Sequence, residues 1–337
     1  MKILFTSNRF HPDIGGIESI ADILARSFVS AGHSLRLVTQ SPGQPDDDLR
    51  RFPFPVLRMP SRGELLACHR WADVVFQNNL EVRQLWPNLL CRRPLLIALH
   101  TWIRTVDGKL TPLQWLKRLV VRSADRVVAV SEAIRCDSLA RAVVIGNPYC
   151  SQLFRCLPDA AREDGIVFLG RLVSDKGVDL LLRSFAEMQR PTWRLTIIGD
   201  GPERPALEHL AQRLGIRQTV HFCGALQGEP LVHVLNQHQL MVIPSRWREP
   251  FGVVALEGLA CGCVVLASDG GGLPDAVGPA GLLFQRENQQ DLTRQLQSLI
   301  EDSALRGRLR QQAPSHLMQF RQDQVASRYL RLLEGLA

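Results

Sequence analysis

The sequence has no long hydrophobic run. No stretch reaches the roughly 18 apolar residues that a membrane-spanning helix requires, and the nearest candidate, residues 253–267, contains Glu257 and two glycines. The first residues, MKILFTSNRF, lead straight into a strand-like pattern and lack the apolar core and cleavage site of a signal peptide. We therefore expect a cytoplasmic protein, whose membrane attachment, if any, would be peripheral and at the inner face.

Paired cysteines and the common nucleotide-binding motifs are missing too. The eight cysteines stand singly, without CxxC pairs or zinc-type Cys/His clusters, and Cys261 and Cys263 come closest together. We expect reduced thiols in the core. No GxGxxG or GxxxxGK(S/T) sequence occurs, which removes the main support for nicotinamide or ATP binding. No Asp-x-Asp motif follows a strand, since DDD at 46–48 is expected in a polar turn, so we expect neither a metal nor a cofactor.

The composition is that of a globular protein with an uneven charge. Hydrophobic residues make up 45% and charged residues 22% of 337 positions, a length that predicts two domains of roughly 150 residues. Residues 1–150 hold 20 Lys and Arg against 13 Asp and Glu, and residues 151–337 hold 20 of each, so the net charge of +7 lies in the first half.

A basic half indicates an anionic partner: nucleic acid, a membrane surface or a phosphorylated substrate. For any single arginine, an ordinary solvated position explains the residue at least as well. The candidates for a face toward a phosphate-bearing acceptor or an anionic membrane are Arg92, Arg93, Arg104, Lys117, Arg118 and Arg122.

Short apolar, β-rich runs alternate with helical patterns along the whole chain, as in KILFTS followed by IESIADILARSFVSAG. The rhythm restarts after 150–165, an aperiodic stretch that we interpret as a linker. We expect an α/β protein with two Rossmann-like, doubly wound parallel-sheet domains facing a central cleft, residues 1–152 and 153–314. The tail, residues 315–337, is predicted to form one amphipathic helix.

The loops after the strands are where open α/β sheets bind ligands. Gly15 and Gly16 open a helix after the first strand, where bare backbone lets an anion approach the N–H groups. A plain helix-starting turn explains this pair equally well.

Arg171 and Lys176 bracket a short loop after the first strand of the second domain. Both could converge on one phosphate, the arginine through its planar fork and the lysine as a point charge. The alternative is surface salt bridging to Asp175 or Asp179.

The stretch EPFGVVALE places two acids around a turn that opens a helix. Phe251 is expected to contact the donor, and the amides of Gly252, Val253 and Val254, just after it, are expected at the helix N-terminus, where they can bind a phosphate. Two acids flank this turn, Glu249 before it and Glu257 in the second helical turn, within reach of a ribose diol. Acids on both sides of an anion site suit a nucleotide sugar, with a hexose at one end and a ribose at the other.

His100 ends the strand PLLIALH. From the sequence alone, a histidine at such a position is more often a satisfied structural residue than a site residue.

These blocks together resemble the retaining glycosyltransferases of family 4, which have the two-domain GT-B fold and a Glu-x7-Glu signature. The resemblance extends over nearly the whole chain, through GGIE, LHTW, VAVSEAI, GRLVSDKG, IIGDGPE, EPFGVVALE and VLASDGGGLPDAVG. It implies that the last helix crosses back to the first domain. It also implies a nucleoside diphosphate sugar as the donor and no metal requirement.

The resemblance assigns roles to individual residues. Arg171 and Lys176 would bind the donor diphosphate, Glu249 would contact the transferred sugar and Glu257 the ribose. His100 would lie near the transferred sugar. Gly15 and Gly16 would lie beside the phosphates on the acceptor side.

The expected function is transfer of a hexose-type sugar to an acceptor hydroxyl, with retention, in bacterial cell-surface glycan or glycolipid synthesis. The acceptor would be a glycan, a lipid-linked intermediate or a small molecule, and no nucleic acid partner is expected. Two alternatives are a nucleotide-sugar epimerase on the same scaffold and a non-catalytic nucleotide-sugar-binding subunit. The sequence departs from the pattern at Asn147-Pro148 and Cys263, where relatives often carry Asn-Gly and Pro, which concerns turn geometry.

Overall fold

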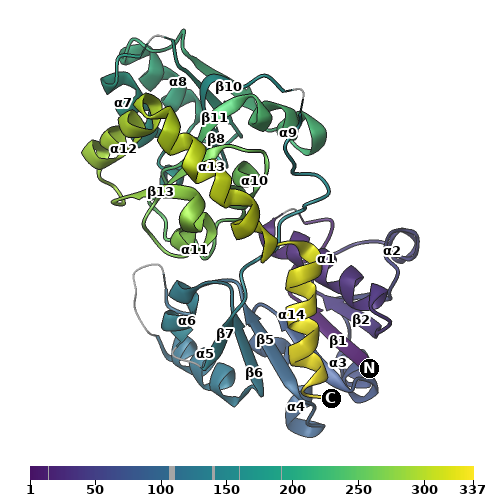
Figure 1. Ribbon diagram of the computed structural model, residues 1–337. Helices are drawn as coiled ribbons and strands as arrows, with labels where there is room; N and C mark the ends of the chain where they lie inside the picture. Colours follow the sequence, from purple (N-terminus) through teal and green to yellow (C-terminus); the bar gives the residue numbers. More distant parts are fainter. Residues whose placement is uncertain (14, 106–110, 139–140, 159, 191) are drawn as a thin grey trace. The chain divides into compact units, whose positions relative to one another are not determined.

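A computed structural model describes the chain except residues 14, 106–110, 139–140, 159 and 191. It divides into two compact units (Figure 1): the first comprises Met1–Pro148 with Gln322–Ala337, and the second comprises Tyr149–Arg321. Each unit contains one parallel sheet with helices packed on it. The predicted α/β class with two doubly wound parallel-sheet domains is therefore confirmed.

The first unit is built on a sheet with the strand order β3-β2-β1-β4-β5-β6-β7, in which all neighbouring pairs are parallel. The strands are β1 (Lys2–Ser7), β2 (Ser34–Thr39), β3 (Val56–Arg58), β4 (Val74–Asn78), β5 (Leu95–Leu99), β6 (Arg126–Ala129) and β7 (Ala142–Val144). The helices before the second unit are α1 (Gly16–Ser30), α2 (Pro45–Arg51), α3 (Arg62–Trp71), the 3-10 turn η1 (Val82–Gln84), α4 (Pro87–Leu90), α5 (Pro112–Ser123) and α6 (Glu132–Ser138).

The second unit repeats this plan with the order β10-β9-β8-β11-β12-β13, again all parallel. The strands are β8 (Glu163–Leu169), β9 (Arg194–Ile198), β10 (Val220–Gly224), β11 (His238–Ile243), β12 (Val264–Ser268) and β13 (Gly281–Phe284). The connecting elements are η2 (Ser174–Lys176), α7 (Val178–Glu187), α8 (Arg204–Arg213), α9 (Gly228–Asn236), α10 (Val253–Ala260), α11 (Leu273–Val277), η3 (Gly278–Ala280), α12 (Gln289–Glu301) and α13 (Ser303–Met318).

Both sheets are covered on their two faces, which explains why their central strands are almost continuously apolar. Strand β5, for example, is buried at all five positions, and residues 240–243 of β11 are buried as well. The core of the second unit is formed by β8, β9 and β11 packed against α7, α8 and α12.

The C-terminal tail differs from the single helix predicted for 315–337. Helix α13 ends at Met318, and a new helix, α14 (Gln322–Glu334), begins after a short turn. Val325, Tyr329 and Leu333 of α14 are buried in the core of the first unit, so the last residues of the chain belong to that unit. The unit boundaries lie at 148/149 and 321/322 rather than at the predicted 152/153 and 314/315.

Residues 45–71 form α2, β3 and α3 in succession. The DDD run, expected in a polar turn, forms the first turn of α2, after Pro45 at its start. Asp48 is buried and makes a bidentate ion pair with Arg58 of β3, with both distances 2.7 Å. A capping box of Ser61 and Glu64 then starts α3.

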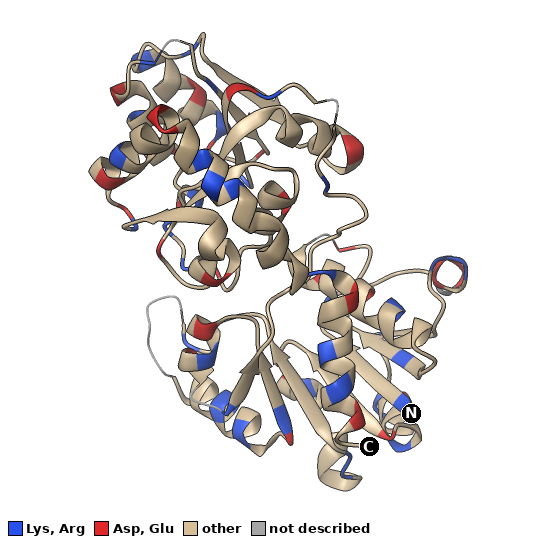
Figure 2. Cartoon of the chain, viewed as in Figure 1, with Lys and Arg blue, Asp and Glu red and all other residues tan. Residues whose placement is uncertain are grey.

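The described Lys and Arg side chains of the first unit do not form one basic element. In the part of the chain that the structure describes, Lys and Arg of the first unit are spread over several helices and strands, rather than gathered on one element (Figure 2).

Candidate active site

Two loops meet at the carboxyl edge of the second sheet. The first follows β8 and carries Arg171 and Lys176, and the second follows β11 and carries Glu249. Ligands of parallel α/β sheets bind at this edge, because the loops leading into the helices gather there.

Lys176 and Glu249 join the two loops directly. Lys176 Nζ lies 2.5 Å from Oε1 of Glu249, and the two side chains are 21% and 15% exposed. The Ser245 hydroxyl donates to the same carboxylate oxygen over 2.9 Å. Among the described residues, none is bonded to Oε2 of Glu249, so this oxygen is available to a ligand.

Arg171 lies exposed on the first of these loops. Its guanidinium makes no ion pair with any described residue. The alternative prediction, salt bridging of Arg171 or Lys176 to Asp175 or Asp179, is therefore wrong. An exposed guanidinium on the loop that also carries Lys176 is suited to bind an anion.

Asp179 instead fixes the second loop. Arg246 donates to both of its carboxylate oxygens, over 2.6 and 2.8 Å. Burial opposes the charged form, yet the Arg246 guanidinium holds the pKa of Asp179 below its usual value. The backbone N–H of Arg246 also donates to the Asp175 carbonyl over 2.8 Å. The β11 loop is thus tied to the start of α7.

Two glycines allow these loops to approach each other. Gly177 has φ +68°, and a Cβ there would lie 2.1 Å from the carbonyl oxygen of Pro244. Gly271 has φ +68°, and a Cβ there would lie 2.2 Å from the carbonyl oxygen of Glu249. The neighbouring Gly272 N–H donates to that same oxygen over 2.7 Å.

Ser245 and the glycine run 270–272 both position Glu249, although no role was predicted for either. The DGGG run directly after β12 was the available signal.

Helix α10 starts at the predicted place, with Gly252 as its N-cap at φ +109°. The first-turn amides of Val253 and Val254 are among those that a helix leaves without intrahelical partners. Phe251 is different from the prediction, because its side chain is only 2% exposed and packs 5.5 Å from the ring of Phe320. It anchors the turn, and only its backbone could face a ligand.

Glu257 lies on α10, where it is partly buried. Desolvation raises its pKa to about 7. No described residue supplies a hydrogen bond or a neutralising cation to this carboxyl group. Such an unpaired acid in the second turn of a helix that begins at a strand-end loop is a candidate for ligand contact.

In the first unit, Gly15 and Gly16 lie at the start of α1, as predicted. A Cβ on Gly16 would meet nothing within 4 Å, so the protein leaves open space there. A Cβ on Gly15 would meet the carboxylate of Glu18, and the Asn78 side chain ties the carbonyl of Ile17 to the end of β4 over 3.2 Å.

His100 follows β5 and is 3% exposed. Its Nδ1 lies 3.1 Å from Oδ1 of Asn147, and Asn79 accepts a hydrogen bond from its backbone N–H over 3.3 Å. Burial lowers its pKa to about 4. An N–H at Nδ1 leaves the buried Nε2 as an acceptor, and no described residue pairs with it.

The predicted basic face is only partly available. Arg104 and Arg118 both pair with Asp137, and Arg118 is buried. Arg92 pairs with Asp125 over 3.0 Å. Arg93 donates to the carbonyl of Arg70. The remaining candidates of that set are the half-buried Lys117 and the exposed Arg122, both on α5.

The cysteines and the possible metal ligands of the described residues form neither disulfides nor a metal cluster. All eight cysteines are unpaired, as expected, but Cys136 and Cys156 are exposed rather than in the core. Within the described ranges, no three His, Cys, Asp or Glu side chains group as a metal site would require.

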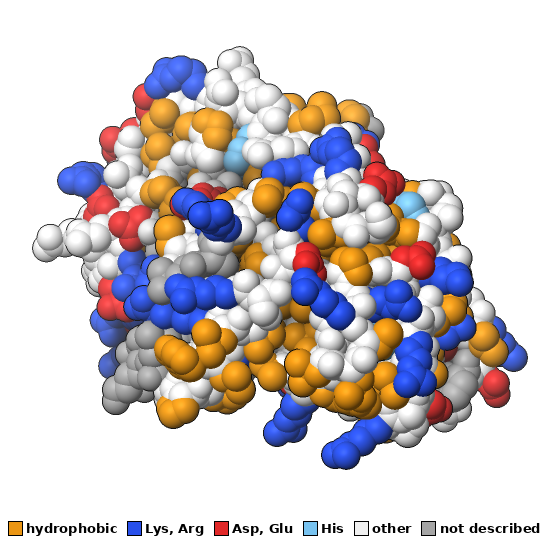
Figure 3. Space-filling model, turned by 90° about the horizontal axis from the view of Figure 1, so that it is seen from below, with side chains coloured by type: hydrophobic (Ala, Val, Ile, Leu, Met, Phe, Trp, Pro, Cys, Tyr) orange, Lys and Arg blue, Asp and Glu red, His pale blue; other side chains and the backbone are white. Residues whose placement is uncertain are grey.

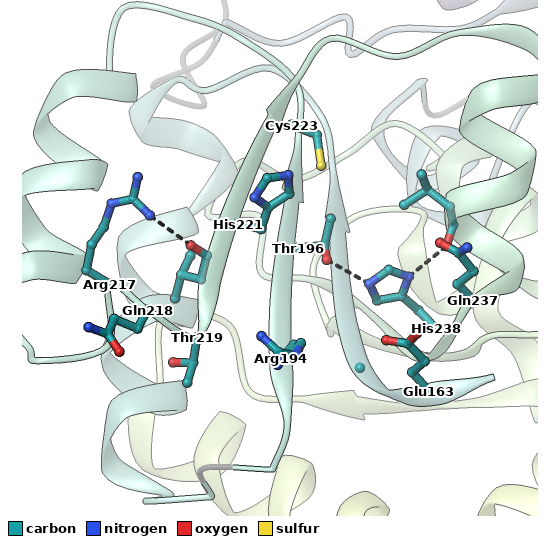
Figure 4. A pocket seen from close by; sticks show the side chains of 13 residues that line it. Glu163, Arg194, Thr196, Arg217, Gln218, Thr219, His221, Cys223, Gln237 and His238 are labelled. Carbon is teal, nitrogen blue, oxygen red and sulfur yellow. Dashed lines mark hydrogen bonds between the residues drawn. The ribbon is translucent and has the colours of Figure 1, made fainter. Parts of the chain in front are cut away.

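A hollow of about 590 Å³ lies at the opposite edge of the second sheet, where β8–β11 begin (Figure 4). His238 is satisfied there by Thr196, at 2.7 Å, and by the Val234 carbonyl, at 2.6 Å. Arg217 likewise donates to the carbonyl of Val220. These groups hold the strand starts together.

Two family models match the chain, one for each half. "Glycosyltransferase Family 4" matches residues 14–145, and "Glycosyl transferases group 1" matches residues 157–316.

Curated relatives include the D-inositol 3-phosphate glycosyltransferase of Corynebacterium jeikeium (strain K411), 37% identical over 186 residues. That alignment covers 52% of this chain and 44% of the relative, so the chain matches less than half of the relative's length. The gpi3 subunit of the phosphatidylinositol N-acetylglucosaminyltransferase of Schizosaccharomyces pombe is 26% identical over 331 residues, 88% of this chain and 72% of the relative.

Among solved structures, Anabaena Alr3699/HepE in complex with UDP aligns with a TM-score of 0.86 and 23% identity. The alignment covers 100% of both chains, which supports the GT-B fold. The family models, the relatives and this fold agree with one another. The chain belongs to the group 1, family 4 glycosyltransferases.

Proposed function

We propose that the protein transfers a hexose-type sugar from a nucleoside diphosphate sugar to an acceptor hydroxyl, with retention of configuration at the anomeric carbon. The observation that carries this proposal is the Lys176–Glu249 pair, because it unites a cation suited to the diphosphate with an acid suited to the sugar. The two residues lie on different loops of the second sheet, and each loop follows the carboxyl end of a strand. Parallel α/β sheets bind nucleotides at this edge.

The diphosphate is held by three groups. Arg171 has no ion pair with a described residue, Lys176 has two further N–H donors, and the first turn of α10 offers backbone amides. When the sugar–phosphate bond breaks, negative charge develops on the leaving diphosphate. These fixed positive groups would stabilise it by several kcal/mol, on the order typical of preorganised sites. We propose that they suffice without a metal ion.

The two acids hold the ends of the donor. Oε2 of Glu249 accepts from a hydroxyl of the transferred sugar, since Oε1 is already occupied by Lys176 and Ser245. Glu257 accepts from the ribose hydroxyls, which replace the solvation that it lacks.

The neutral His100 supplies an acceptor from the first unit. Its unpaired Nε2 would receive a hydrogen bond from a sugar hydroxyl, and its low pKa keeps the ring uncharged at neutral pH. Gly15 and Gly16 would lie beside the phosphates, and Gly16 has open space around it. The acceptor oxygen bonds to the anomeric carbon as the sugar–phosphate bond breaks, and the acceptor proton passes to the leaving phosphate, so no protein base is assigned.

The names of two relatives favour a phosphorylated acceptor. One acts on D-inositol 3-phosphate and the other on phosphatidylinositol, and both therefore carry sugar to a phosphate-containing molecule. We propose a role in bacterial cell-surface glycan or glycolipid synthesis.

A surface of the first unit supports attachment to an anionic membrane. Leu113, Trp115, Leu116 and Leu119 of α5 are between 40% and 61% exposed, whereas Arg118 of the same helix is buried. This reverses the usual order, in which apolar side chains face the core.

Helix α4 of the same unit also exposes apolar side chains. Leu89 and Leu90 of α4 are 88% and 69% exposed, and the Arg92–Asp125 pair links the ends of the two helices. Neither helix contains an acidic residue. In the space-filling view, hydrophobic side chains lie at the surface between Lys and Arg side chains (Figure 3). Apolar anchors beside cations suit an anionic lipid surface. None of the described helices is both long and apolar enough to cross a membrane.

The reaction is tested by incubating the protein with a panel of UDP, GDP, ADP and TDP sugars, with and without phosphorylated and unphosphorylated polyol acceptors. Anomeric configuration of donor and product is read by NMR. An α-linked product from an α-linked donor, unaffected by a chelator, is expected. An epimer formed without acceptor would show the epimerase alternative, and binding without turnover would favour the non-catalytic subunit.

A further inference from the structure

A pocket of about 530 Å³ lies in the first unit, at the carboxyl ends of its first four strands. Asn8 follows β1, Gln40 follows β2, Arg62 starts the helix after β3, and Arg83 lies in the turn after β4. Neither the sequence motifs nor the proposed donor site uses these residues. The pocket nevertheless lies at the edge of the sheet where ligands of this fold class bind.

Two cations of this pocket have no partner. Arg62 and Arg83 are exposed, and neither guanidinium makes an ion pair or a hydrogen bond with any described residue. Nearby arginines differ, since Arg58 is held by Asp48 and Arg93 by a backbone carbonyl.

The one acid that lines the pocket is already engaged. Glu81 accepts a hydrogen bond from the backbone N–H of Arg83 over 3.3 Å and thereby caps η1. The lining side chains leave a positive excess. Two guanidiniums from different loops in one pocket are the arrangement that binds a phosphate through several charge-assisted hydrogen bonds.

Gln84 provides an independent indication of a ligand. The residue is 4% exposed, and it lines the pocket. Neither its amide nitrogen nor its amide oxygen has a hydrogen-bond partner among the described residues. A buried amide without partners costs folding free energy, so a ligand that both donates and accepts hydrogen bonds would satisfy it.

We propose that this pocket binds the acceptor and that the acceptor is a phosphate ester of a polyol or sugar. Arg62 and Arg83 hold the phosphate, the Gln84 amide bonds hydroxyl groups, and the half-buried Trp86 offers a flat apolar face to a ring. This proposal rests on the proposed transferase function and names the substrate class of its acceptor side.

The test measures binding of two soluble probes, inorganic phosphate and inositol 1-phosphate, by isothermal titration calorimetry on the full chain. We expect both probes to bind the unaltered protein. Inositol, which has no phosphate, is the uncharged comparison and should bind more weakly. The double substitution R62Q/R83Q should lower the affinity for both probes by about tenfold or more, on the order expected for losing charge-assisted hydrogen bonds. Higher salt weakens binding to the unaltered protein and has less effect on the double variant.

A matched control is R70Q, which removes an exposed arginine of the same helix, α3, that does not line the pocket. It should leave phosphate binding unchanged. Nucleoside diphosphate binding should persist in all variants, because none of its proposed residues lines this pocket. Loss of phosphate binding with intact nucleotide binding therefore separates this proposal from the proposed donor site.

The source of the phosphate is resolved by a second arm, with phosphatidylcholine vesicles that contain or lack phosphatidylinositol. Binding of the soluble probes that depends on Arg62 and Arg83 identifies a free phosphate ester. If only binding to the phosphatidylinositol vesicles depends on Arg62 and Arg83, the ligand is a lipid headgroup. If neither probe nor vesicle distinguishes R62Q/R83Q from R70Q, the proposal is overturned.

Discussion

Lys176 and Glu249 are 73 positions apart in the sequence, yet their side chains meet at 2.5 Å. The two side chains are only 21% and 15% exposed, so removing one partner would leave the other poorly solvated. Arg246 and Gly272 fix the loop around Glu249 from two further directions. We therefore expect substitution of Glu249 to affect chemistry more than nucleotide affinity.

Substitution of Glu249 by Gln keeps the shape and removes the charge. We expect the turnover number to fall by 10²-fold or more, on the order seen when a preorganised polar group is lost, while nucleotide affinity measured by calorimetry stays within about twofold. The control is E229Q, which breaks the exposed Arg155–Glu229 pair of the same unit and should leave both quantities unchanged. Unchanged turnover in E249Q would remove Glu249 from the site.

The raised pKa of Glu257 predicts a pH-dependent stability. The folded pKa of about 7 exceeds the ordinary 4.5, so the group favours folding below pH 4.5 and opposes it increasingly as pH rises through 7. E257Q should therefore stabilise the second unit, by about 2 kcal/mol more at pH 8 than at pH 5. Urea unfolding at the two pH values measures this difference. An equal effect at both would contradict the raised pKa.

The same group predicts how nucleotide affinity depends on pH. If the ribose hydroxyls donate to the ionised carboxylate, binding should weaken about tenfold from pH 8 to pH 6, because the free carboxyl is largely protonated at pH 6. E257Q should bind more weakly at pH 8 but without this slope. A parallel slope in both proteins would place the titration elsewhere.

His100 predicts an opposite stability profile. Its folded pKa of about 4 lies below the ordinary 6.5, so the neutral ring contributes stability above pH 6.5 that is lost as pH falls toward 4. Against H100Q, the unaltered protein should lose about 2 kcal/mol more between pH 7.5 and pH 5. Because His100 stays neutral, transfer by the unaltered protein should show no inflection near pH 6.5 from this residue, and H100Q should reduce turnover.

Gly177 and Gly215 form a matched pair for testing how the β8 and β11 loops fit. Both have positive φ, +68° and +72°, but a Cβ would strike the Pro244 carbonyl only at Gly177, whereas nothing lies within 4 Å at Gly215. G215A should cost about 1 kcal/mol of folding free energy, and G177A about 2 kcal/mol more. G177A should also weaken donor binding. Equal costs would mean that the loop contact is not rigid.

The apolar surface of α5 predicts vesicle binding. Replacing Trp115 and Leu116 together by Ser should abolish cosedimentation with anionic vesicles, because the apolar anchors are lost while the cations remain. The control M318S removes an apolar residue of the second unit that is 57% exposed. If the unaltered protein and the α5 variant sediment alike, no membrane role remains for this helix.

The sequence was most informative where a motif lies within one loop. The Glu-x7-Glu stretch and the β8 loop were correctly placed at strand ends, because glycine turns and apolar strands mark these positions locally. Phe251 was misread because burial by Phe320, about 70 positions away, is a tertiary effect. The start of α2 was missed although Pro at the first position and acids in the first turn are helix-starting signals.

The pocket in the first unit could not have been predicted. Its lining residues are scattered between positions 8 and 86 and follow four different strands. None of them belongs to a recognisable motif. The unpaired state of Arg62 and Arg83 is also invisible in the sequence, because it depends on which acids the fold brings near. Glu81, the acid next to them, bonds to backbone instead.

The placement of α14 bears on how the protein can be dissected. Tyr329 and Leu333 fill the core of a unit whose other residues end at Pro148. A fragment that ends at Pro148 would lack α14, which would leave a large apolar cavity, and the fragment should aggregate. A rearranged chain in which residues 322–337 are linked ahead of Met1 would keep the unit intact. Residues 1–148 and the final helix therefore form one folding unit, although they are separate in the sequence.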